Sequence, residues 1–298
     1  MAEDELFGAA FDDDIFEAEK VRNPIASLQI QKASYTAKHE DHGWFHSEDS
    51  IAHLMTTRHG PNQIKLTIEH DYLYKRYARA LQTSLEYIAA VEDENIDCKV
   101  VNPREIIETA ALCAMKLDDI ETALQCADKI NSRELGSLQT RGVVYMRGGR
   151  YSDAISCFIQ YNNMRALDYK PWRHMTSTFL KSYEDEPSED NKLRLHLADA
   201  SIQRSLTILS AGAWPNVDFA RARYQREYEE MKVLETRIKD LGGSASVFFA
   251  AMSATGESIP LSLQLFKWDD IIWIDAECRR VAGNKDIEDE HTKSVREL

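Results

Sequence analysis

The chain has 298 residues, enough for one or two domains with a hydrophobic core. Only 12 glycines and 7 prolines interrupt it, and this low count favours long helices over a turn-rich β fold. The formal net charge of −14 opposes broad electrostatic attraction to nucleic acid or to an anionic membrane, so protein partners are expected.

Residues 1–25 form an acidic segment with aromatic side chains spaced through it. The first nineteen residues carry eight acidic groups, which oppose autonomous packing, together with several large apolar groups. This interleaving is typical of disordered segments that order on a partner. The contact residues would then be Phe7, Phe11 and Phe16; the alternative is a solubilising tail whose aromatic residues have no role.

Residues 26–61 read as a mixed, loop-like region that ends at the helix-breaking pair Gly60–Pro61. Five of the nine histidines fall here: His39, His42, His46, His53 and His59. Imidazole nitrogens bind zinc, but no cysteine lies nearby and the spacing is not the H-E-x-x-H of a zinc protease. We therefore predict a solvated loop anchored by Trp44 and Phe45, with no metal site. A metal-dependent enzyme that uses these histidines is the weaker alternative.

From about residue 62 to residue 210 the apolar residues recur with the period of a helix. Two such runs meet at the short polar turn Asp118–Asp119, and small residues occupy their facing positions. Small residues allow antiparallel helices to approach closely, and a short turn leaves the two helices adjacent. The pattern predicts a series of helical hairpins.

The stretch Arg141–Phe158, RGVVYMRGGRYSDAISCF, admits three interpretations: a phosphate-binding loop, an RGG-type nucleic-acid element, or the bend between two helices. A phosphate loop needs Lys followed by Ser or Thr after its last glycine, and Arg150-Tyr151 does not provide this pair. A single RGG in an acidic chain is weak support for RNA binding. The bend is favoured, with Gly142 permitting close helix contact and Gly149 relieving the turn.

The same stretch resembles the tetratricopeptide repeat, a helical hairpin of 34 residues. The characteristic positions of that pattern are Gly142, Tyr145, Gly149, Tyr151, Ala154 and Phe158. Residues 135–168 match best, and one 34-residue step from Leu138 reaches Trp172 in the next first helix. The alanine that follows each turn recurs at Ala80 and Ala123, but the spacings are uneven, so the first repeats are irregular.

The fourth hairpin contains an insertion, Tyr183–Asp190, before a helix near Leu193–Leu209. From Val217 to Leu241 the apolar residues alternate between spacings of three and four, and Glu227 breaks this stripe once. Such a stripe suits a dimeric coiled coil or a single helix that caps the open end of a solenoid. Capping is favoured because a terminal repeat must cover its last apolar face.

The resulting prediction is an all-α, tetratricopeptide-like helical-hairpin solenoid with a C-terminal capping helix and a disordered acidic N-terminus. Residues 62–210 would form the repeats, residues 211–282 the capping helix and a further helical segment, and residues 283–298 a polar tail. The aromatic-rich sequence Trp268–Trp273 is expected in the core or in the cap, with an exposed partner surface as the alternative.

The five cysteines lie far apart, form no Cys-x-x-Cys pair and have an odd total: Cys98, Cys113, Cys126, Cys157 and Cys278. This usage argues against a disulfide framework and suits a reducing compartment. The first ten residues lack the basic and apolar regions of a secretory signal, and no apolar run approaches the ~20 residues of a membrane span. A cytoplasmic or nuclear location is therefore expected.

Several stretches together resemble an animal protein family that is named for its chromosomal open reading frame and has tetratricopeptide-like repeats. They are LFGAAFDDDIFEAEK, ASYTAKHEDHGWFHSED, DYLYKRYARALQTSLEY, YKPW and GESIPLSLQLF. The resemblance runs through most of the chain in order; it implies helical repeats and supplies no mechanism. Such families sometimes carry a zinc-finger-and-homeobox label through a readthrough transcript. We set that label aside because the chain has neither Cys₂His₂ spacing nor a basic recognition helix.

The function predicted from these features is that of a non-enzymatic adaptor or scaffold that uses no cofactor. Stacked hairpins present a groove lined by their first helices, which suits an extended or helical peptide. The repeat register places six residues on that groove: Gln139, Thr140, Val143, Arg173, His174 and Ser177. Arg173 is the residue expected to pair with a ligand carboxylate. The alternative is an assembly subunit that docks through its N-terminal aromatic residues. The oligomeric state is left open.

Overall fold

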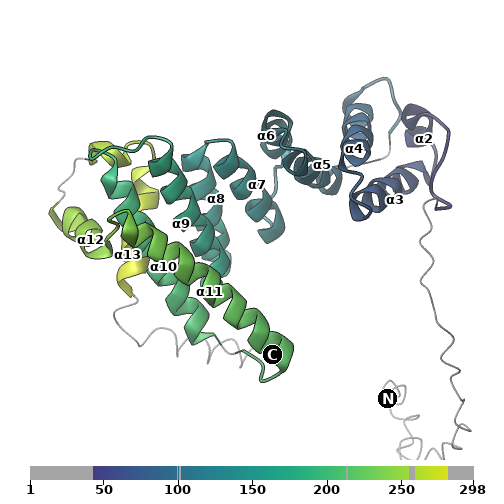
Figure 1. The fold of residues 1–298 in the computed structure, drawn as a ribbon. Coiled ribbons are helices and arrows are strands. Elements are labelled where there is room, and N and C mark those ends of the chain that lie inside the picture. The colour runs from purple at the N-terminus through teal and green to yellow at the C-terminus, as the bar shows by residue number, and fades with distance from the viewer. Residues whose placement is uncertain (1–42, 99, 101, 213, 255–258, 281–298) are drawn as a thin grey trace, which may run out of the picture. The chain divides into compact units, whose positions relative to one another are not determined.

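A computed structural model describes residues 43–98, 100, 102–212, 214–254 and 259–280. All of them belong to the second of two units, residues 1–42 and 43–298, into which the chain divides. The described residues form helices and no strand (Figure 1). The helices are α2 (Ile51–Thr56), α3 (Gly60–Leu73), α4 (Tyr77–Glu92), α5 (Arg104–Lys116), α6 (Ile120–Lys129), α7 (Leu135–Arg147), α8 (Tyr151–Met164), α9 (Tyr169–Glu184), α10 (Lys192–Ala211), α11 (Asp218–Asp240), α12 (Ala245–Ala254), the 3₁₀ turn η1 (Leu261–Leu263) and α13 (Trp268–Arg280). The predicted acidic segment, with Phe7, Phe11 and Phe16, and the predicted polar tail lie outside the described residues.

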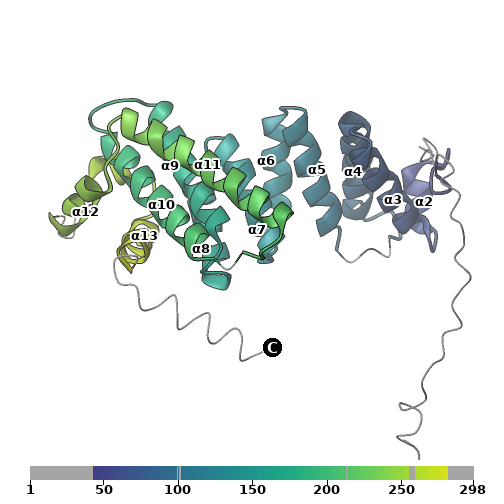
Figure 2. The same cartoon turned by 60° about the horizontal axis from the view of Figure 1, so that its bottom comes forward.

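Helices α3 to α10 pair in sequence order as four antiparallel hairpins, visible as successive pairs in Figure 2. Within each hairpin the two helices contact each other, and the second helix also contacts the first helix of the next hairpin. The first helices α3, α5, α7 and α9 contact one another in the same order. The predicted all-α helical-hairpin solenoid is confirmed.

Three of the four hairpin turns have the same backbone geometry. Lys75, Asp118 and Gly149 each lie two residues before the second helix, with positive φ angles of 60°, 60° and 76°. In each turn the next residue donates its backbone N–H to the carbonyl five residues earlier, at 2.8 to 2.9 Å. This bond belongs to the Schellman motif that ends a helix at a left-handed residue. Aligning the hairpins on their turns is therefore correct, and the fourth turn differs because it contains the predicted insertion.

The close helix contact predicted at Gly142, between α7 and α8, is present. A Cβ atom added to Gly142 would lie 2.5 Å from the ring of Phe158, well inside van der Waals contact. Ala154 and Phe158 are both completely buried. The small residue thus makes room for the aromatic ring of the second helix, as the repeat pattern requires.

Helix α11 covers the end of the last hairpin. Its apolar stripe includes the buried Met231 and Ile238 and packs on α10, where the Ser205 hydroxyl lies 3.1 Å from the Met231 sulfur. The segments after it, α12, η1 and α13, also contact α10. In α13 the Trp273 ring stacks on Trp172 with centroids 5.6 Å apart. The predicted capping helix is confirmed, and the aromatic-rich segment contributes to the core.

Two details of the predicted loop region differ in the structure. Residues 51–56 form helix α2, and the Ser50 side chain caps it by accepting a hydrogen bond from the His53 backbone N–H. Trp44 does not anchor the loop, because 78% of it is exposed. Phe45 does anchor it: its ring contacts His70, and its carbonyl accepts a hydrogen bond from the Thr67 hydroxyl.

Candidate functional site

The six predicted groove residues lie on α7 and α9, two first helices that contact each other. We call them the groove face: Gln139, Thr140, Val143, Arg173, His174 and Ser177. They form three pairs of positions, each 34 residues apart, so each residue on α7 has its repeat equivalent on α9. All six are partly buried, which leaves part of each side chain at the surface. A role in partner binding stays a prediction.

Arg173 does not have a free guanidinium in this structure. Its Nη1 atom lies 2.9 Å from an Oε atom of Glu227, and its Nη2 atom lies 2.7 Å from an Oε atom of Glu230. Both carboxylates come from α11, so the capping helix supplies the anions that a ligand was expected to supply. Glu227 is the residue that interrupts the apolar stripe of α11, and this ion pair explains the interruption.

His174 acts as an aromatic group rather than as a cation. Its ring stacks on Phe158, with centroids 5.2 Å apart and planes 14° apart. Burial, helped by the charge of Arg173, lowers the pKa of His174 to about 4. The imidazole is therefore neutral at pH 7 and offers a partner ring surface and hydrogen-bonding nitrogens. The Ser177 hydroxyl already donates to the Arg173 carbonyl at 3.1 Å.

The groove face extends to α5, where the sequence analysis assigned no contact residues. Ala123 and Ala154 are equivalent and 31 residues apart, so the positions matching Gln139, Thr140 and Val143 are Glu108, Thr109 and Leu112. Glu108 accepts a hydrogen bond from the Ser137 hydroxyl of α7, which links the two first helices. The 31-residue step between the alanines was the signal that could have identified these residues.

Polar contacts join the first helices elsewhere along the series. Lys65 of α3 pairs with Glu105 of α5, and Arg147 of α7 donates to the Met115 carbonyl of α5 at 3.1 Å. Hydrogen bonding to Glu105 raises the pKa of Lys65, so the pair is ionised at neutral pH. These contacts fix neighbouring hairpins side by side without filling the half-buried positions of the groove face.

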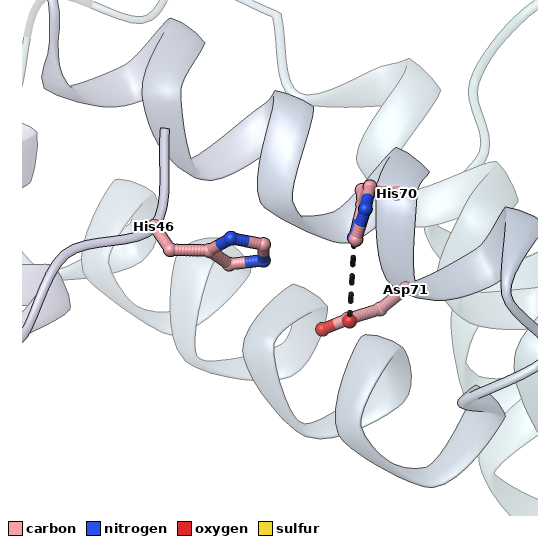
Figure 3. A group of neighbouring side chains, drawn as sticks. All are labelled: His46, His70 and Asp71. Atoms are coloured by element: carbon pink, nitrogen blue, oxygen red, sulfur yellow. Dashed lines mark ion pairs between the residues drawn. The ribbon is translucent and has the colours of Figure 1, made fainter. Parts of the chain in front are cut away.

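A second cluster of chemically active side chains joins the loop before α2 to the end of α3. His46, His70 and Asp71 place one possible ligand atom each within 4.8 Å of one another, and Figure 3 shows the His46 ring directed toward His70. The two imidazole rings meet edge to face at 5.0 Å. Such a set has the composition of a metal site.

Two contacts oppose metal binding at this cluster. Both Asp71 oxygens accept hydrogen bonds from the Arg79 guanidinium, at 2.5 and 2.6 Å, so a cation already neutralises this buried carboxylate. The Nδ1 atom of His46 accepts a hydrogen bond from the Gly43 backbone N–H at 2.7 Å. In the neutral ring the other nitrogen, Nε2, then carries the proton and has no lone pair for a metal.

The cluster is better explained as the anchor of the loop. Arg79 joins α4 to Asp71 of α3, and the tilted and edge-to-face contacts among the rings of Phe45, His46 and His70 hold the loop on α3. Among the five histidines of the predicted loop region, His39 and His42 lie outside the described residues. The metal-dependent alternative gains no support from the part of the chain that can be described.

Comparisons with protein-family models and with curated proteins find no match for this chain, so neither assigns a family or a function. The resemblance noted from sequence stretches and the tetratricopeptide name for the hairpins stay predictions. No helix among the described residues is both long enough and apolar enough to cross a bilayer.

Proposed function

We propose that this protein is a non-enzymatic, tetratricopeptide-like adaptor that binds a peptide segment of a partner protein on its groove face. Hairpin solenoids bind extended or helical peptides along the surface formed by their first helices. The observation that carries the proposal is the set of equivalent positions on the contacting helices α5, α7 and α9, each half-buried except the exposed Leu112.

The composition of these positions supports recognition rather than catalysis. Val143 and Leu112 offer apolar contact, Thr109 and Thr140 offer hydroxyl groups, and the neutral His174 offers a ring. Interfaces that bind peptides combine apolar contact with a few hydrogen-bonding groups in this way. The groove face contains no nucleophile paired with a base, and the proposal assigns it no reaction.

The test compares two variants of the full chain in affinity purification from native cells, with quantitative mass spectrometry. Thr140→Glu with Val143→Glu adds charge to the groove face, and the matched control Gln160→Glu with Asn163→Glu adds the same charge to exposed positions of α8. Partners that bind the groove should be lost with the first variant and kept with the second. Equal partner recovery from both variants, with circular dichroism unchanged, would reject the proposed surface.

A third variant separates the alternative in which the acidic N-terminal segment is the docking element. Replacing Phe7, Phe11 and Phe16 with Ala leaves the groove face intact. Partners that depend on the groove face should be retained by this variant. Loss of the same partners only when the phenylalanines are replaced would favour the assembly-subunit alternative.

A further inference from the structure

Helix α11 has two faces along its length, and the capping contact uses only one of them. The inner face carries Met231 and Ile238, which are buried where α11 packs on α10. A second stripe, with residues at alternating spacings of three and four, lies on the opposite side of the helix. We call this stripe the outer face, and all of its residues are exposed: Phe219, Ala222, Arg226, Glu229, Val233, Thr236 and Asp240.

The ion pairs of α11 leave the outer face unoccupied. Glu227 and Glu230 bind Arg173 of α9, and Arg237 binds Glu184 at the end of the same helix. These residues lie beside the stripe and not in it. Within the described part of the chain, none of the ion pairs of α11 involves an outer-face residue.

Two large apolar side chains project from the outer face. Phe219 is 78% exposed and Val233 is 71% exposed, and they lie two heptads apart on the same line along the helix. Apolar groups that are aligned on an exposed helix face mark an interaction surface. A shallow cavity of about 520 Å³ lies over the second half of this face, and its lining residues are Lys232, Val233, Thr236, Arg237, Asp240 and Leu241.

We propose that the outer face pairs with the outer face of a second copy of this chain, with the two α11 helices antiparallel. A two-fold axis between positions 227 and 228 sets Ala222 opposite Val233 of the second copy. In such a pair every contact occurs twice, once on each side of the axis. The paired stretch, Asp218 to Arg237, extends for about 30 Å along the helices.

This register places Phe219 over the cavity of the second copy. The residue directly opposite Phe219 is Thr236, and a side chain in a helix pair inserts among four residues of the facing helix. Those four residues of the second copy all line the cavity: Val233, Thr236, Arg237 and Asp240. The hydrocarbon stem of Arg237 adds apolar surface around the ring. The exposed ring and the cavity therefore match each other in position.

The same register brings opposite charges together. Helix α11 has equal numbers of basic and acidic residues, so its surface offers no strong attraction to a highly charged ligand. Its charges alternate along the helix, however, and the two-fold axis sets unlike charges opposite or beside one another. The resulting pairs, each formed twice, are Arg226 with Glu229, Arg223 with Glu230, and Asp218 with Lys239.

Charge also selects the antiparallel orientation. In a parallel pair in register, Arg226 would face Arg226 and Glu229 would face Glu229, and like charges at such positions repel. One helix pair buries less surface than a standard protein interface, so we expect a reversible dimer at concentrations of about 10 to 100 μM. The inference goes beyond the adaptor function and does not rest on it, because no groove-face residue takes part.

The test is sedimentation velocity of the full chain across that concentration range, where the chain should pass from monomer to dimer. Phe219→Glu with Val233→Glu should weaken dimerisation by about a hundredfold or more, because charge replaces the apolar contacts on both sides of the axis. The matched control is Leu73→Glu with Leu261→Glu, which alters two side chains outside α11 that are 76% and 81% exposed. It should leave dimerisation unchanged. Circular dichroism checks that both variants keep their helices.

Further variants test the register. Arg226→Glu alone should weaken the dimer by about tenfold or more, and adding Glu229→Arg should restore it, because the exchange rebuilds both ion pairs. Ala222→Cys chains mixed with Val233→Cys chains should form a mixed disulfide when oxidised with copper phenanthroline. Ala222→Cys chains alone should not cross-link to one another.

Three results would overturn the inference. They are a chain that stays monomeric throughout the range, a dimer that survives Phe219→Glu with Val233→Glu, and Ala222→Cys chains that cross-link to one another. A monomeric chain that retains a different protein through Phe219 and Val233 would assign the outer face to that protein and reject the second copy. None of these results bears on the groove face, which its own variants test.

Discussion

Replacing Gly142 with Ala tests the packing on which the hairpin series depends. The new Cβ would lie 2.5 Å from Phe158 Cε1, whereas ordinary contact begins at 3.4 Å. The Phe158 ring cannot easily move away, because it is fully buried and stacks on His174. Overpacking of this kind costs ~1–3 kcal/mol, while the better helix propensity of Ala returns ~1 kcal/mol. We expect the free energy of unfolding to fall by up to ~2 kcal/mol.

Gly136 in the same helix provides the matched control. A Cβ on Gly136 would meet nothing within 4 Å, so Gly136→Ala changes helix propensity without a clash and should raise stability by up to ~1 kcal/mol. The difference between the two variants, ~1–3 kcal/mol, isolates the steric effect of the ring. Urea unfolding at an unchanged m-value measures it. If Gly142→Ala is as stable as Gly136→Ala, the close approach of α7 and α8 does not exist as described.

Other expected outcomes concern the turns, the buried histidine and the histidine–aspartate cluster. Gly149→Ala should lower stability by ~1–2 kcal/mol in urea unfolding because φ is 76° there, whereas Asp118→Gly, at φ 60°, should not. The pKa of His174 falls from 6.5 to about 4 on folding, so the unfolded chain binds more protons between these values and stability drops as the pH is lowered. His174→Gln should reduce the loss of stability between about pH 7 and about pH 5 by ~2 kcal/mol; an unchanged pH profile would show that the ring is not buried in neutral form. Added zinc should leave the melting temperature unchanged because Arg79 occupies both Asp71 oxygens, and a clear rise would contradict this reading of the cluster.

The hairpins and their alignment were predictable because they depend on local sequence. Gly142 and Ala154 directly indicate a close contact between two helices. In three hairpins the turn residue with positive φ lies two residues before the second helix. The capping role of α11 followed from its apolar stripe and from the need to cover the last repeat. These inferences require only neighbouring residues and a short turn.

The surroundings of the groove face were not predictable in the same way. Arg173 forms ion pairs with Glu227 and Glu230, which lie more than fifty residues away in the sequence, and no local sequence pattern predicts such ion pairs. The interruption of the apolar stripe at Glu227 indicated a special role but not its partner. Likewise, Asp71 lies in a helix whose sequence gives no sign that Arg79 of the next helix will bind it. Long-range ion pairs depend on how elements pack, which the periodicity of one element does not encode.

The order of contacts between the hairpins α3–α4, α5–α6 and α7–α8 implies the order in which this part of the chain unfolds. Each pair contacts mainly the pairs before and after it, with further contacts from α3 and α4 to α2 and from α8 to α13, so no single element of this stretch contacts all the others. Under heat or denaturant the hairpins can therefore unfold one after another, starting at α3. Helices α9 and α10 should unfold last, because α11 and α12 cover them as well. Amide hydrogen exchange should be fastest near α2 and α3 and slowest in α10. A bound peptide that spans several hairpins would stabilise them against this stepwise unfolding.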